Sequence, residues 1–165
     1  MFGIYKTLLH STGIDNAVYC NFINSQDMNL ITASNNVLKV YKLNHDDGIS
    51  GQTRKKFKLE FVASFNLFGS ICSIDACRYG SMSKDALVIA FHDAKLSIVE
   101  YDTSTADLST LSMHYFENEM IDEGLHYNVH RPILRVDPNM RCAVMLIYGC
   151  KLVVVSFTEE VITNP

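Results

Sequence analysis

The sequence predicts an all-β fold, a partial β-propeller of about three four-stranded antiparallel blades with the last blade incomplete. The first observation is a strand–turn–strand pattern that occurs three times, aligned on Leu38, Leu96 and Leu152 at intervals of 58 and 56 residues. The second is that further short strand-like segments flank each copy, and four antiparallel strands per repeat is the composition of a propeller blade. The third is that no segment shows the apolar period of a stable amphipathic helix.

The central copy shows the hairpin pattern most clearly. An apolar strand over 86–91 is followed by the polar turn 92–94 and a second strand over 95–101. Short polar residues such as His92 and Asp93 favour a tight turn, because their side chains satisfy backbone groups there. The corresponding turns are 34–36 and 148–150. Each second strand has Leu first, a β-branched residue third and a large apolar residue last (Val40 and Leu43, Ile98 and Tyr101, Val154 and Phe157).

The remaining strands follow in order along a single domain, 1–165, which we interpret as the N-terminal part of a propeller. Its units are expected at approximately 17–66, 70–117 and 131–165. The first unit has predicted strands at 17–23, 29–33, 38–43 and 58–65, with a polar loop over 44–53. The second has strands at 71–77, 86–91, 95–101 and 108–116, and the third at 133–136, 142–147 and 152–157. A further strand over 2–8 is expected to precede the repeats.

The number of units is too small for a closed ring. Propellers close with about four to eight blades, and the period near 57 residues is longer than the ~40–50 usual for a blade. The sequence therefore predicts a piece of a larger propeller or a truncated product, with unpaired sheet faces at both ends. A closed sandwich of about eleven strands is the alternative, although it leaves the period unexplained.

Composition excludes several classes of protein. The chain has 165 residues, 48% of them hydrophobic, so general disorder is excluded, and its net charge of −4 provides no bulk positive field for nucleic acid. No apolar run approaches the length of a membrane span, and we expect no membrane partner. The five cysteines lack metal-type C-x-x-C spacing and are interpreted as reduced thiols of an intracellular protein (Cys20, Cys72, Cys77, Cys142 and Cys150).

An ordered set of short segments carries a family resemblance from about Tyr5 to Phe157. The segments are Val18–Phe22, Lys84–Leu87, Asp93–Ser97, Val99–Asp102, Leu108, Thr110–Ser112, His114–Phe116, Asn128–His130, Arg135–Pro138 and Arg141–Ala143. Together they resemble the N-terminus of the largest subunit of the cleavage and polyadenylation specificity factor. The chain contains no Trp, so the WD dipeptide of common propellers is absent, as it is in this family.

The resemblance implies a nuclear, non-enzymatic scaffold built from three propellers. That family shares its architecture with the large subunit of the damaged-DNA-binding complex and with a splicing-factor subunit. It is implied to hold a WD-repeat subunit and a zinc-finger subunit, which read the polyadenylation signal, and to link them to the endonuclease module. Contact with pre-mRNA is therefore expected to be indirect. A fragment of a related DNA-repair or splicing scaffold, or a general protein-interaction module, is the alternative.

One basic cluster is a candidate for direct RNA contact. Arg54, Lys55, Lys56 and Lys58 surround Phe57, so the cations could bind phosphates while the ring stacks on a base. The competing interpretation is a solvated loop that runs into a strand, with Phe57 in the core.

Other polar groups have simpler interpretations. His126 and His130 have a ligand-like spacing only on a helix, and no third ligand lies nearby, so no metal site is predicted. The acidic run Glu117, Glu119, Asp122 and Glu123 is expected to solubilise a loop or, if functional, to dock a basic partner. No nucleophile elbow, phosphate loop or framed carboxylate pair is present, so we predict no catalytic residue and no cofactor. An enzyme on a β-sandwich is the remaining alternative.

Overall fold

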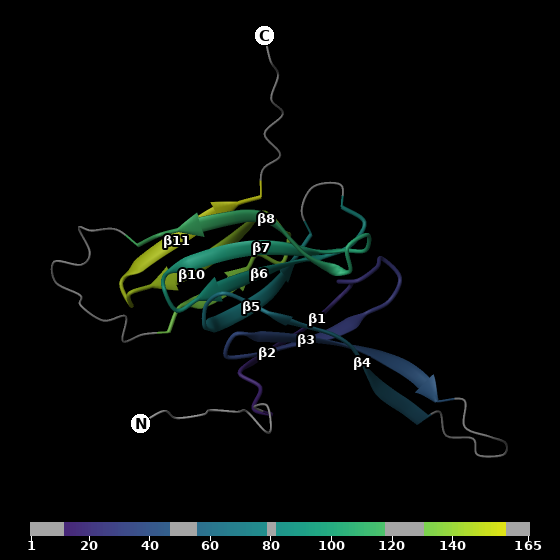
Figure 1. Ribbon diagram of the computed structural model, residues 1–165. Coiled ribbons are helices and arrows are strands. Elements are labelled where there is room, and N and C mark those ends of the chain that lie inside the picture. The colour runs from purple at the N-terminus through teal and green to yellow at the C-terminus, as the bar shows by residue number, and fades with distance from the viewer. Residues whose placement is uncertain (1–11, 47–55, 79–81, 118–130, 158–165) are drawn as a thin grey trace, which may run out of the picture.

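The computed structural model describes residues 12–46, 56–78, 82–117 and 131–157 (Figure 1). All regular elements in these ranges are strands, which form three antiparallel sheets that we call blades 1, 2 and 3. Blade 1 contains β1 (Asn16–Cys20), β2 (Asn29–Ser34), β3 (Val37–Asp46) and β4 (Lys56–Asn66). Blade 2 contains β5 (Ile71–Cys77), β6 (Ala86–Phe91), β7 (Lys95–Asp102) and β8 (Asp107–Tyr115). Blade 3 contains β9 (Ile133–Val136), β10 (Cys142–Ile147) and β11 (Lys151–Ser156).

The three blades are stacked with blade 2 in the middle. Strand order within each sheet follows the chain, β1 to β4, β5 to β8 and β9 to β11. The first strand of blade 2, β5, lies against β1 on one side and β9 on the other, so the first strands form the inner side of the stack (Figure 1). This arrangement confirms the predicted partial propeller of four, four and three strands, and the alternative of one closed sandwich is wrong.

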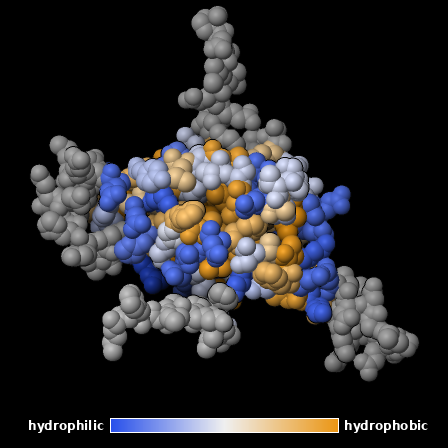
Figure 2. All heavy atoms as spheres, viewed as in Figure 1, coloured by the Kyte–Doolittle hydropathy of each residue, from blue (hydrophilic) through white to orange (hydrophobic). Residues whose placement is uncertain are grey.

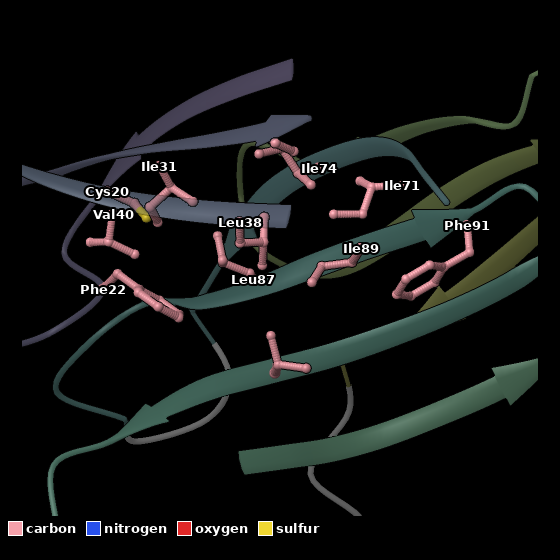
Figure 3. Close-up of a cluster of buried hydrophobic side chains, with 12 residues drawn as sticks. Cys20, Phe22, Ile31, Leu38, Val40, Ile71, Ile74, Leu87, Ile89 and Phe91 are labelled. Atoms are coloured by element: carbon pink, nitrogen blue, oxygen red, sulfur yellow. The ribbon is translucent and has the colours of Figure 1, made fainter. Parts of the chain in front are cut away.

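Blade 2 owes its burial to neighbours on both faces. Every residue of β6 is buried, which is expected for a central strand covered on both sides. Because side chains alternate along a strand, Leu87, Ile89 and Phe91 face blade 1, while Ala86, Val88 and Ala90 belong to the cluster with blade 3. Figure 3 shows the first cluster, in which these larger residues meet Cys20, Phe22, Ile31, Leu38 and Val40 of blade 1.

The three hairpin turns align in sequence, but the non-glycine residue with positive φ occupies a different position in each turn. Asn35 has φ of 52° in blade 1, Ala94 has 50° in blade 2, and Tyr148 and Gly149 have 52° and 69° in blade 3. Asn tolerates this left-handed region because its short side chain bonds locally. The Asn35 carbonyl accepts a hydrogen bond from Ile71 N at 2.6 Å, so the turn of blade 1 joins the start of blade 2.

The strand boundaries differ most from the sequence prediction in two places, at the end of β1 and at the connection between β3 and β4. Strand β1 ends at Cys20 rather than at residue 23, and Ile23 N instead donates to Asn29 Oδ1 at 3.1 Å. Strands β3 and β4 continue past the end of β2 as a two-stranded arm, 43–46 with 56–59, which includes part of the predicted loop. A bulge at Val62, between the pairs Val40–Ala63 and Tyr41–Phe61, changes the register at the base of this arm. The predicted strand over 2–8 lies outside the described residues.

Candidate functional site

The predicted basic cluster is only partly within the described chain. Arg54 and Lys55 lie outside it, and Lys56 begins β4, paired in register with Asp46. Lys58 is exposed on the arm. Adjacent residues of a strand point to opposite faces, so Phe57 and Lys58 do not form one stacking and phosphate-binding surface. Glu60, two residues further on the Lys58 face, accepts a hydrogen bond from Asn44 and places a carboxylate beside the cation.

The other predicted polar groups contribute little to the described surface. His126, His130, Glu119, Asp122 and Glu123 lie outside the described residues, while Glu117 is exposed just after β8. Across residues 12–46, 56–78, 82–117 and 131–157, no group of three or more His, Cys, Asp or Glu side chains could hold a metal ion. The same ranges contain no helix of the length and apolarity that crossing a membrane requires.

Hydrogen bonds between the inner strands join the blades. Asn16 Nδ2 of β1 donates to Cys72 O of β5 at 3.0 Å. On the other side, Val136 N of β9 donates to Asp75 Oδ2 of β5 at 3.0 Å. Sequence reasoning missed both contacts. Polar residues interrupting the apolar strand 71–77 were the available signal, because a polar group in a covered strand needs a partner.

Blade 1 has an apolar face turned away from blade 2. The register places Tyr19, Leu30, Tyr41 and Phe61 in one row across β1 to β4. Tyr19 and Phe61 are 53% and 56% exposed, and the rings of Tyr41 and Phe61 meet edge to face at 5.8 Å between centroids. We call this row, together with Leu43 and Leu59 on the arm, the blade 1 outer face.

Blade 3 has a second apolar face, also turned away from blade 2. Ala143, Met145 and Ile147 of β10 are buried against blade 2, so the alternate residues face outward. Register places Ile133, Leu146 and Leu152 in one row and Val144 beside Val154. Leu152 and Val154 are 63% and 59% exposed. These five residues form the blade 3 outer face, a contiguous exposed apolar surface.

A groove of about 460 Å³ lies between blades 1 and 2, with the end of β4 and its following turn on one side and β6, β7 and β8 on the other. Its lining contains Lys95 at the start of β7 and Asp107 at the start of β8. Most of the remaining lining side chains are apolar, among them Phe65, Phe91 and Met113, and a few carry hydroxyl or amide groups. Figure 2 shows how hydrophobic residues gather at the centre of the face seen there, between hydrophilic ones. Sequence reasoning did not identify the groove, because its two walls are more than 20 residues apart in the chain.

The thiols of the buried residues Cys20 and Cys77 have raised pKa values and low reactivity. Burial, reinforced by the charge of Asp85, raises the pKa of Cys20 and of Cys77 from the ordinary value of 9.0 to about 12. A thiol with such a pKa contains almost no thiolate at neutral pH, and the thiolate is the reactive species. All five cysteines are free, and these two have the properties of core residues rather than of nucleophiles.

Comparison with known proteins assigns the family. The model of the RSE1/DDB1/CPSF1 first β-propeller matches residues 13–162. The chain is 38% identical over 97% of its length to "Cleavage and polyadenylation specificity factor subunit 1" of Drosophila melanogaster, and it covers 12% of that protein. It is 32% identical over 68% of its length to the Arabidopsis thaliana protein of the same name, covering 8% of it. "Protein CFT1" of Coccidioides immitis is 30% identical over 86% of the chain, which covers 11% of that relative.

The chain thus spans about an eighth or less of the length of these curated relatives. The stacked sheets of four, four and three strands agree with the fold in the name of the matching family model. From the model match and the relatives together, this chain belongs to the RSE1/DDB1/CPSF1 first β-propeller family, with its similarity to the N-terminal region of cleavage and polyadenylation specificity factor subunit 1.

Proposed function

We propose that this chain is a non-enzymatic scaffold element of the nuclear machinery that cleaves and polyadenylates pre-mRNA. The observation that carries the proposal is the family match over residues 13–162. The two apolar outer faces support it, because a propeller blade exposed on one face presents surface for assembly. A role in assembly needs no catalytic group.

The partners proposed are the other subunits of the specificity factor: its WD-repeat subunit, its zinc-finger subunit and its endonuclease module. Pre-mRNA recognition then runs through these subunits. The names of the relatives of this chain support membership of the complex as a whole. The choice of individual partner subunits is part of the proposal. Recognition of RNA by partner subunits, rather than by this chain, agrees with its net charge of −4, because an acidic chain does not favour extensive contact with phosphates.

Purification of the tagged chain from nuclear extract, followed by mass spectrometry, tests the proposal. We expect polyadenylation subunits in the eluate. A matched variant, Leu152→Lys with Val154→Lys, replaces exposed apolar side chains on the blade 3 outer face and leaves the buried face of β10 unchanged. Loss of partners from this variant would place the contact on that face. A folded wild-type chain that retains no polyadenylation subunit would contradict the proposal.

Direct RNA contact by Arg54, Lys55, Lys56 and Lys58 is a subordinate proposal. The exposed position of Lys58 supports it, and the neighbouring Glu60 weakens it. Lys55→Glu with Lys56→Glu should lower retention of RNA by the assembled complex and reduce its salt dependence, because fewer counterions are then released from the RNA. Unchanged retention over a salt series would remove these residues from the RNA surface.

A related DNA-repair or splicing scaffold is the second candidate. It is favoured by the description of the family model, which groups RSE1 and DDB1 with CPSF1. The relatives at 38% and 32% identity carry the name of the polyadenylation factor and favour the first candidate. The same purification separates the two, because the eluate would then contain splicing or repair subunits in place of polyadenylation subunits.

A further inference from the structure

We propose that the groove between blades 1 and 2 binds an extended peptide segment of a partner protein that combines a large apolar side chain with a carboxylate. Both walls of this groove belong to blades 1 and 2 of this chain. The site is therefore complete without the further blades that a closed propeller would need. It is also distinct from the two outer faces, which point away from blade 2.

A fixed cation provides one half of the recognition. Lys95 Nζ lies 4.2 Å from the centroid of the Phe91 ring and donates to Phe68 O at 2.8 Å. Within the described part of the chain, no carboxylate lies within ion-pair distance of this ammonium group. Lys95 as a whole is half-buried. Its ammonium group is held in place but not neutralised, and it favours an anionic ligand, since charge-assisted bonds are about twice as strong as neutral ones.

The apolar surface around Lys95 provides the other half. Phe68, at the mouth of the groove, is 95% exposed, and Met113 on β8 is 45% exposed. Tyr115, which pairs in register with Lys95 but does not itself line the groove, is 67% exposed. Aromatic and Met side chains that are this exposed around one hollow are typical of recognition surfaces, where they bury the apolar side chain of a ligand.

The shape of the groove favours an extended backbone. Lys95 and Asp107 lie at opposite ends of the β7–β8 hairpin, because Lys95 pairs with Tyr115 and Asp102 with Asp107. At about 3.3 Å per residue, the strand from Lys95 to Asp102 is roughly 23 Å long, enough for six or seven extended residues. Strand β4 is the edge of blade 1, so it offers unpaired backbone groups to a peptide that adds as a strand.

The charges also give the ligand a direction. With a cation at one end and a carboxylate at the other, the groove favours an acidic residue near Lys95 and a neutral or basic residue near Asp107. A nucleic acid does not fit this distribution, because its phosphates follow one another at short intervals and need several cations. A peptide with separated charges does fit it.

The test uses the whole chain and a fluorescein-labelled peptide, Ser-Glu-Phe-Ser-Val-Ser-Lys, followed by fluorescence anisotropy. We expect saturable binding that weakens about tenfold in Lys95→Gln and recovers in Lys95→Arg, because one charge-assisted bond contributes on the order of 1.4 kcal/mol. Met113→Glu should weaken binding similarly by placing a second carboxylate against the ligand. Lys39→Gln and Met140→Glu, on other surfaces, are the matched controls and should bind as wild type does.

A peptide with Lys in place of Glu should not bind. Nuclear magnetic resonance should place the shifts caused by the peptide at the amides of Ser64 to Leu67 and of Lys95 to Val99, which line or border the groove. Absence of saturable binding, equal affinity for Lys95→Gln and wild type, or shifts confined to the outer faces would each overturn the proposal. Displacement of the peptide by a single-stranded RNA oligomer would also overturn it, since it would identify a phosphate site.

Discussion

Asp85 and Asn21 join blades 1 and 2 through a reciprocal pair of hydrogen bonds. Asp85 N donates to Asn21 O at 2.8 Å, and Asp85 Oδ2 accepts from Asn21 N at 2.9 Å. The other carboxylate oxygen accepts from Arg78 Nε at 2.8 Å. One residue between β5 and β6 therefore ends β1 and fixes the position of the chain as it leaves blade 1.

Replacing Asp85 should loosen this junction. In Asp85→Ala the Asn21 amide loses a charged acceptor, which contributes about 2 kcal/mol in a mostly buried position. We expect hydrogen exchange at the Asn21 amide to become roughly 30-fold faster, measured by nuclear magnetic resonance. Asp85→Asn keeps one oxygen acceptor and should have a smaller effect. Asp93→Ala, which removes an exposed turn carboxylate, is the control, and equal exchange in all variants would refute the junction.

Gly69 should resist substitution. Its φ of 134° is rarely adopted by other residues, and a Cβ there would lie 2.8 Å from Phe91 Cδ1. Gly69→Ala should therefore lower the free energy of unfolding by about 1–3 kcal/mol, measured by urea denaturation. The control is Gly149→Asn, because a φ of 69° lies in the left-handed region that Asn tolerates. Equal stability of wild type and Gly69→Ala would mean that the turn before β5 rearranges without cost.

The buried thiols should make stability fall at alkaline pH. Below pH 9 both the folded and the unfolded chain keep the Cys20 and Cys77 protons, whereas above pH 9 only the unfolded chain releases them readily. The unfolded state then binds fewer protons, so the free energy of unfolding decreases as pH rises from about 9 toward 12. Urea titrations at pH 8, 9 and 10 should show a shallower decrease for Cys20→Ala with Cys77→Ala. Parallel decreases for both proteins would assign the effect to other groups.

The isolated chain should self-associate. The blade 1 and blade 3 outer faces expose large apolar side chains, and contacts between two different faces can continue from copy to copy. Sedimentation velocity should show oligomers that grow with concentration, and the Leu152→Lys with Val154→Lys variant should shift the distribution toward monomer. Met140→Lys is the control, since that side chain is 38% exposed in the turn between β9 and β10. A wild-type monomer at all concentrations with a sharp two-state melt would contradict this expectation.

The repeat aligned on Leu38, Leu96 and Leu152, together with the strand-like segments that flank each copy, was sufficient to predict the described strands and their grouping into sheets. Alternating and continuous apolar runs report directly whether a strand is covered on one face or both, and β6 shows the second case. The strand ends were less predictable. Strand β1 ends at Cys20 because the amide of the next residue, Asn21, donates to the carboxylate of Asp85 instead of to a neighbouring strand. That hydrogen bond joins positions 64 residues apart.

The candidate sites also differ in how much of each the sequence could predict. Residue types alone indicated the basic segment around Lys58. The strand geometry then places the side chains of Lys58 and Phe57 on opposite faces of β4. The groove at Lys95 exists only because blade 2 lies against blade 1, which brings Phe68 and Met113 to one hollow. The amino-acid sequence by itself determined the strand pattern and the number of blades, since these depend on local periodicity, and an ordered set of short segments carried the family resemblance. The tertiary structure decided which faces remain uncovered and where a charge meets an apolar surface, because both depend on contacts between residues far apart in the chain.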